Sequence, residues 1–236
     1  MASLRNLKVI VLLFLLGILT FPLSLNGQNP AKTEISKENS TDPELVKKAT
    51  GWVASLNLNN TEKEKRVIGV IVAHLESIRT WHNQHPANTV PEGINPVTGK
   101  PLNELDRQII ADSAIPKSIH ENLMAGLRKD LSEEQVESIL DKYTVGKVAF
   151  TLAGYHSIVP DLTSEEETTI LGFLKEAREM AVDYKSMKQI SSIFEIYKTK
   201  SEQYLNSNGR NWRALYKAYS DSVKAKKAEE AKAVNK

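Results

Sequence analysis

The chain has 236 residues, no cysteine, and 31 Lys and Arg residues against 29 Asp and Glu residues. The lack of cysteine excludes disulfide scaffolds, thiol catalysis and lipidation through cysteine. A nearly balanced charge provides no extended positive field, which argues against nucleic acid as a partner.

Residues 1–27 have the order of a secretory signal peptide. Arg5 and Lys8 precede an apolar run over residues 9–19, and Pro22 interrupts this run before it reaches the roughly 20 apolar residues of a membrane span. We expect cleavage after residue 27, export to the periplasm or cell surface, and no membrane attachment of the mature chain. Cleavage removes both basic residues of the leader, so the mature chain has 29 basic and 29 acidic residues.

The mature chain divides by composition into three parts. Residues 28–40 are polar and unpatterned, as in a flexible tether. Residues 41–223 carry apolar side chains at spacings of three and four, which predicts a single all-α, helical-bundle-like domain of five to seven helices. Residues 86–101 contain four prolines and two glycines, and they predict one long loop of undefined role. Residues 224–236 form a charged C-terminal tail.

Several helix starts carry the pattern of a capping box. In this motif a Ser or Thr hydroxyl and a Glu or Gln three residues later bond free backbone N–H groups. The pairs are Thr41 with Glu44, Thr61 with Glu64, Ser132 with Gln135, and Thr163 with Glu166. Residues 144–159 are ambiguous, because they mix β-branched residues with helix formers; we favour a helix there.

A cluster of histidines at the end of the second predicted helix raises the question of a metal site. His82 and His85 are three residues apart and His74 precedes them, but no third ligand has a recognisable spacing. The HExxH motif and cysteine pairs are absent. We therefore expect neither a metal nor an organic cofactor.

Motifs for nucleophilic catalysis are also absent. The chain has no G-x-S-x-G elbow, no P-loop and no dinucleotide glycine fingerprint. The paired carboxylates of a glycosidase or lyase need no motif, so the sequence leaves that alternative open. On balance it favours a protein that is not an enzyme.

Residues 79–85, which we call the corner at the end of the second predicted helix, have the residue types of a sugar-binding site. Sugars bind flat aromatic faces, with planar hydrogen-bonding groups around them. The candidate ligand-binding residues are Arg79, Trp81, His82, Asn83 and His85, joined by Tyr155, His156 and Arg178 if the helices bring them together. Alternatively, Trp81 is the last residue of the apolar stripe on its helix and is buried.

Four stretches of the sequence resemble a known family. They are HLESIRTWHN, DKYTVGKVAFTLAGYHSIVPDLTSEEE, LKEAREMAVD and IFEIYKTKSEQYLNSNG. They resemble a family of small secreted proteins of unknown function from polysaccharide-degrading Bacteroidetes, which is sometimes described as sugar-binding. The resemblance implies a non-catalytic protein that binds an oligosaccharide or polysaccharide during polysaccharide utilisation.

Two alternatives stand beside this prediction. LSEEQ at residues 131–135 and LTSEE at residues 162–166 are similar to the Leu-Thr-x-x-Gln motifs of periplasmic helical chaperones, which implies a chaperone-like role. The other alternative is an enzyme that acts on oligosaccharides.

Overall fold

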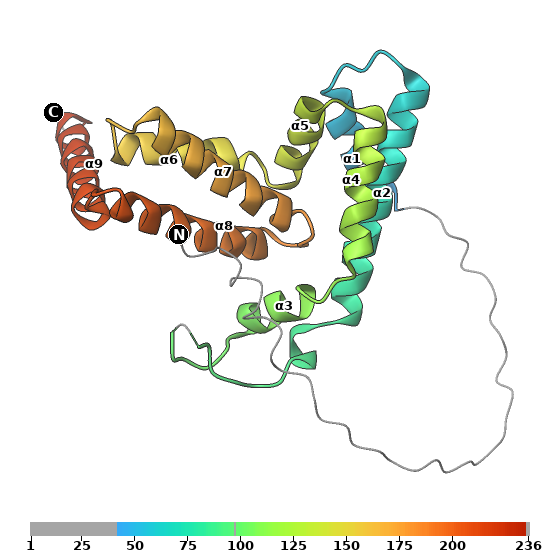
Figure 1. Cartoon of the computed structure of the whole chain (residues 1–236), viewed down its shortest axis with the longest axis horizontal. Helices are drawn as coiled ribbons and strands as arrows, with labels where there is room; N and C mark the ends of the chain where they lie inside the picture. The colour runs from blue at the N-terminus through green and yellow to red at the C-terminus, as the bar shows by residue number, and fades with distance from the viewer. Residues whose placement is uncertain (1–41, 97, 235–236) are drawn as a thin grey trace, which may run out of the picture. The chain divides into compact units, whose positions relative to one another are not determined.

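Helices dominate residues 42–96 and 98–234, the part of the chain that the computed structural model describes (Figure 1). The first helices are α1 (Pro43–Ala54), α2 (Thr61–Gln84), α3 (Glu104–Asp112), α4 (Lys117–Asp130) and α5 (Glu133–Tyr143). They are followed by α6 (Lys147–Ile158), α7 (Ser164–Ala181), α8 (Met187–Ser207) and α9 (Trp212–Val234). The all-α prediction is confirmed. The predicted signal peptide and tether lie outside the described residues.

The number of helices differs from the prediction. The described residues form nine α-helices rather than five to seven. Residues 102–130 divide before Pro116 into α3 and α4, because the ring of a proline disfavours helical geometry in the residue before it. The ambiguous segment is a helix, α6, which begins after Val145 and Gly146, both with positive φ (55° and 67°).

Capping residues explain where the helices begin. The capping boxes at the starts of α5 and α7 are confirmed. At α2, however, Asn60 rather than Thr61 is the cap, and its Oδ1 accepts from the backbone N of Lys63 at 2.9 Å. At α1 the cap is Asp42 rather than Thr41. Both differences follow the preference of N-caps for Asn and Asp over Thr.

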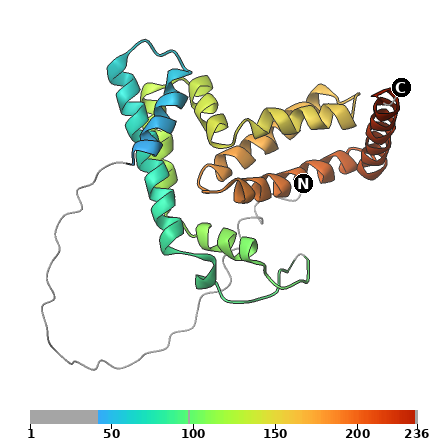
Figure 2. The ribbon, with the colours of Figure 1, turned by 180° about the vertical axis from the view of Figure 1, so that it is seen from behind.

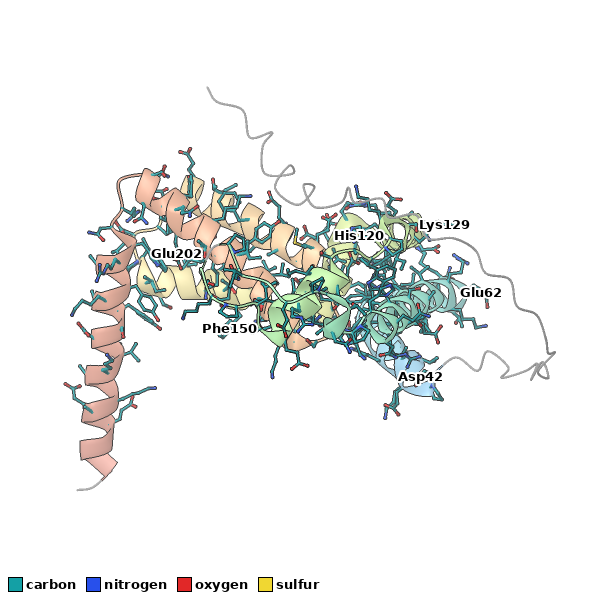
Figure 3. The ribbon with its side chains drawn as sticks, turned by 90° about the horizontal axis from the view of Figure 1, so that it is seen from below. Asp42, Glu62, His120, Lys129, Phe150 and Glu202 are labelled. Atoms are coloured by element: carbon teal, nitrogen blue, oxygen red, sulfur yellow. The ribbon has the colours of Figure 1, made fainter. Side chains whose placement is uncertain are left out.

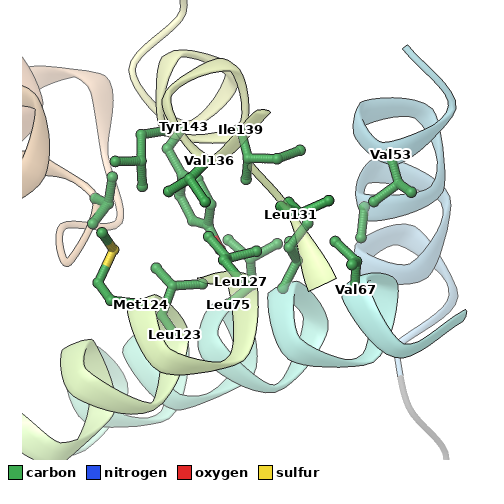
Figure 4. Packing of buried hydrophobic residues seen from close by; sticks show 14 of the residues in the cluster. Val53, Val67, Leu75, Leu123, Met124, Leu127, Leu131, Val136, Ile139 and Tyr143 are labelled. Atoms are coloured by element: carbon green, nitrogen blue, oxygen red, sulfur yellow. The ribbon is translucent and has the colours of Figure 1, made fainter. Parts of the chain in front are cut away.

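The first hydrophobic cluster joins α1, α2, α4 and α5 (Figure 4). Its fully buried members include Val67, Ile71, Leu123, Leu127 and Ile139. The helices α2 and α4 are in close contact at Gly126, where a Cβ atom would lie 2.7 Å from the Cγ2 of Val70. A glycine therefore sets the spacing of this helix pair.

The second hydrophobic cluster joins α6, α7, α8 and the first turns of α9. Its fully buried members include Ile170, Leu174, Ile193 and Leu205. The helices α6, α7 and α8 run side by side in both ribbon views, and α9 continues from the end of α8 (Figures 1 and 2). The predicted tail is helical as far as Val234.

The loop between α2 and α3 has regular structure of its own. It contains a short 3-10 helix, η2 (Ala87–Thr89), and an isolated antiparallel bridge between Ile94 and Pro101. The backbone N of Leu102 donates to the carbonyl oxygen of Gly93 at 2.8 Å, which closes the loop. Among the described helices, none combines the length and apolar character that crossing a bilayer requires.

Candidate functional site

An aromatic groove of about 590 Å³ runs between α6, α8 and α9. The aromatic side chains that line it are Phe150, Tyr155, Phe194, Trp212, Tyr216 and Tyr219. Phe150 of α6 is 80% exposed and Tyr216 of α9 is 53% exposed (Figure 3 labels Phe150). Large apolar side chains that gather at one place on a surface commonly mark a binding site.

Three rings of this groove, those of Tyr155, Trp212 and Tyr216, lie in series. The ring centroids of Tyr155 and Trp212 are 5.3 Å apart, and those of Trp212 and Tyr216 are 6.1 Å apart. Tyr155 is buried, and its hydroxyl donates to the backbone oxygen of Lys198 at 3.2 Å, so it holds Trp212 in place from below. On α9, spacings of four and three residues put Trp212, Tyr216 and Tyr219 on one face.

The polar side chains of the groove are balanced in charge. Two lysines, Lys147 and Lys198, and two glutamates, Glu195 and Glu202, are among the residues that line it. Lys198 Nζ donates to Glu195 at 3.0 Å, so these two charges satisfy each other. Glu202, which is labelled in Figure 3, is half-buried, and it makes no hydrogen bond or ion pair with the described residues. Burial raises the pKa of Glu202, while Lys198 opposes the shift.

An ion-pair cluster fixes the start of α9 and with it one wall of the groove. Arg210 donates through Nε and Nη2 to the two carboxylate oxygens of Glu166, at 2.9 and 2.8 Å, and through Nη1 to Asp161 at 2.7 Å. This guanidinium lowers the pKa of Glu166 to about 2. The backbone N of Trp212 donates to Asn206 Oδ1 at 3.0 Å. The side chain of Arg210 and the backbone N of Trp212 thus fix the turn between α8 and α9.

The predicted sugar corner at the end of α2 is occupied by contacts within the chain. Arg79 donates to Asp42, the cap of α1. The half-buried ring of Trp81 stacks on His85 with centroids 3.7 Å apart, and its Nε1 donates to the carbonyl oxygen of Ala111 at 3.2 Å. Trp81 therefore ties α2 to α3.

The other corner residues also contact neighbouring elements. The Nδ1 of His82 lies 3.3 Å from Oδ2 of Asp112, which also accepts from Gln189 of α8. The carboxamide oxygen of Asn83 accepts from Lys185 Nζ at 3.2 Å. These contacts join α2 to α3, to α8 and to the segment between α7 and α8.

The remaining predicted site residues lie in different places. Tyr155 lines the aromatic groove. His156 is exposed, with Nε2 3.6 Å from Glu167. Arg178 is buried and donates through Nη1 to Asp141 at 2.8 Å. The structure does not gather the eight predicted residues into one site: Arg79 and Trp81 line different pockets, and Tyr155 lines a third.

A buried network joins three helices to the segment between α7 and α8. Asp183 accepts from His74 Nε2 at 3.0 Å and from His120 Nδ1 at 2.9 Å, and the other ring nitrogen of His74 lies 3.2 Å from the Tyr143 hydroxyl. Burial opposes ionisation of Asp183, but the two imidazoles outweigh it and lower its pKa. In the described part of the chain, no three His, Asp or Glu side chains are grouped to hold a metal ion.

The groove residues other than Tyr155 were not predicted as a site. Trp212, Tyr216 and Tyr219 form an apolar stripe that is typical of a helix facing a core. A useful signal was available in residues 147–158, where apolar side chains occur on all sides of the helix. Such a helix cannot bury every apolar residue against one neighbour, and Phe150 is its large apolar residue that is left exposed.

Comparison with known families places the chain in one of them. Residues 43–225 match the model of a family described as a protein of unknown function, DUF3826. The chain belongs to this family. No curated protein matches it significantly. The DUF3826 match runs from the first turn of α1 into α9, and it includes Arg210 and every aromatic residue of the groove.

Proposed function

We propose that this DUF3826 protein binds a neutral oligosaccharide or polysaccharide in the aromatic groove and does not cleave it. The observation that carries the proposal is the exposure of Phe150 and Tyr216 in one groove, on α6 and α9. Residues 1–27 have the order of a secretory signal peptide, and this supports a role in the periplasm or at the cell surface.

The chemistry of the groove suits a sugar chain. The C–H faces of sugar rings stack on aromatic rings, and the groove offers a series of rings rather than one. Glu202 is available to a sugar hydroxyl because it has no partner among the described residues. Two lysines and two glutamates balance each other along the groove, which favours a neutral ligand.

The charges in the groove also support binding without hydrolysis. A glycoside hydrolase of the usual kind needs two carboxyl groups beside the scissile bond. In the groove, Glu195 is paired with Lys198, which leaves Glu202 without a second free carboxyl group among the described lining residues. A binding role needs no such pair.

A panel of neutral plant and algal glycans tests the proposal. We expect at least one to bind the wild-type protein, and Tyr216→Ala to weaken this binding. Ile196→Ala is the matched control, because Ile196 is 60% exposed on α8 but does not line the groove. Absence of binding to the whole panel contradicts the proposal. New reducing ends in a time course contradict its non-catalytic part.

A further inference from the structure

A second cleft, of about 850 Å³, lies between α1, α2, α5 and the segment that joins α7 to α8. Trp52, Tyr143 and Tyr184 contribute aromatic surface to it. Trp52 is half-buried, and its ring centroid lies 4.7 Å from that of Tyr143. The hydroxyl of Tyr143 lies 3.2 Å from Nδ1 of His74, and this contact fixes the orientation of the Tyr143 ring. The cleft therefore has a rigid aromatic base, and its volume is that of a small-ligand site.

The charged side chains of this cleft are mostly positive. Among the described residues that line the cleft, the cations are Lys48, Arg79, Lys142 and Lys185, and the single acid is Asp141. Arg178, which is 4% exposed, already donates to Asp141 at 2.8 Å and neutralises it. The negative charge of the cleft is thus satisfied within the protein.

Three of the four cations lack a carboxylate partner in the described part of the chain. Lys142 makes no ion pair there. Lys185 donates to the neutral carboxamide of Asn83, and Lys48 lies 4.9 Å from the centroid of the Trp52 ring. Arg79, the fourth cation, forms an ion pair with Asp42. This concentration is local, because the whole chain carries a net charge of only +2.

We propose that this cationic cleft binds an anionic saccharide, which carries carboxylate or sulfate groups, as a second site beside the aromatic groove. Lys142 and Lys185 contact the anionic groups, and Trp52 contacts a sugar ring. The saccharide class rests on the proposed function, whereas the site and the charge of its ligand follow from the cations of the cleft. Arg79, predicted from the sequence as a ligand-binding residue, lies in this cleft.

Calorimetric titration of the full chain tests the proposal with three tetrasaccharides: one of glucuronic acid, its carboxyl-reduced neutral form and a sulfated form of the neutral compound. We expect a charged form to bind more tightly than the neutral form, and more weakly when NaCl rises from about 50 to about 500 mM. Lys142→Gln should weaken this binding about tenfold. Lys129→Gln removes the same charge from an exposed position of α4 outside the cleft and should have no effect (Figure 3).

The outcomes separate this proposal from the proposed function. Equal binding of charged and neutral forms, or no effect of Lys142→Gln, overturns the anionic site. If a neutral glycan binds and Tyr216→Ala weakens its binding, the proposed function of the aromatic groove is still supported. Binding of a charged form that depends on Lys142 but not on Tyr216 supports the cleft even if every neutral glycan fails. Whether the carboxylated or the sulfated form binds identifies the anion.

Discussion

Arg210 and Glu166 form a bidentate ion pair that joins the turn before α9 to the first turn of α7. Glu166 also belongs to the capping box of α7, where its Oε2 accepts from the backbone N of Thr163 at 3.0 Å. The buried carboxylate of Glu166 therefore has two roles. It caps the start of α7, and through Arg210 it fixes α9, which forms one wall of the aromatic groove. Loss of this pair affects stability and the groove together.

The stability that this pair contributes depends on pH. Arg210, with smaller help from hydrogen bonds to Thr163, lowers the pKa of Glu166 from 4.5 to about 2. The stabilisation by the ionised carboxylate is therefore complete above pH 4.5 and is lost as pH falls towards 2. We expect Arg210→Met to lower the free energy of unfolding by about 2 kcal/mol at neutral pH. Urea denaturation across this pH range measures the difference between variant and wild type, which should shrink as the solution becomes more acidic.

An exposed ion pair on the same helix provides the control. Lys217 and Asp221 pair on the exposed surface of α9, where solvent screens the charges, so Lys217→Met should change the free energy of unfolding much less than Arg210→Met. A loss for Arg210→Met that stays constant between pH 7 and pH 3 contradicts the assignment to Glu166.

The His120 imidazole should stabilise the fold more in mild acid than in base. Its hydrogen bond to Asp183 raises the pKa of His120 above 6.5, although burial opposes this. The contribution is complete below the unfolded-state pKa and is lost as pH rises through the folded-state pKa. We expect His120→Gln to cost about 1 kcal/mol more at about pH 5.5 than at about pH 9 in chemical denaturation. The exposed variant His156→Gln serves as control, and equal losses for His120→Gln at both pH values speak against the prediction.

Gly126 should tolerate no larger residue, although it lies inside a helix. Alanine improves helix propensity by about 1 kcal/mol, but here its Cβ would lie 2.7 Å from a methyl group of Val70. We expect Gly126→Ala to lower the melting temperature, with a net cost of about 1 to 2 kcal/mol. Gly172→Ala in α7, where a Cβ meets nothing within 4 Å, should be neutral or stabilising. A stabilised Gly126→Ala would show that α2 and α4 are not in this close contact.

Trp81 is expected to serve stability rather than ligand binding. Trp81→Ala removes the stacking on His85 and the hydrogen bond to Ala111, so it should cost about 2 kcal/mol in thermal or chemical unfolding. Glycan binding by the folded variant should stay unchanged. If the Trp81→Ala variant folds but no longer binds glycan, the ligand binds instead at the corner at the end of α2.

Local sequence signals predicted the helices better than the site. The starts of α5 and α7 could be predicted because their capping boxes are local patterns. The hydrogen-bond partner of Trp81 could not be predicted, because Ala111 lies 30 residues further along the chain, on another helix. Phe150 and Tyr216 meet in the groove only after α6 and α9 pack together. A stripe on one helix does not show whether another helix covers it.

The exposed rings of the aromatic groove are the proposed sugar-binding surface. Titration of wild type, Phe150→Ala and Ile196→Ala with a neutral oligosaccharide found in the panel tests it directly. Each lost stacking contact is worth about 0.5 to 1.5 kcal/mol, so Phe150→Ala should raise the Kd roughly 2- to 10-fold while Ile196→Ala leaves it unchanged. An unchanged Kd for Phe150→Ala and for Tyr216→Ala would contradict the account.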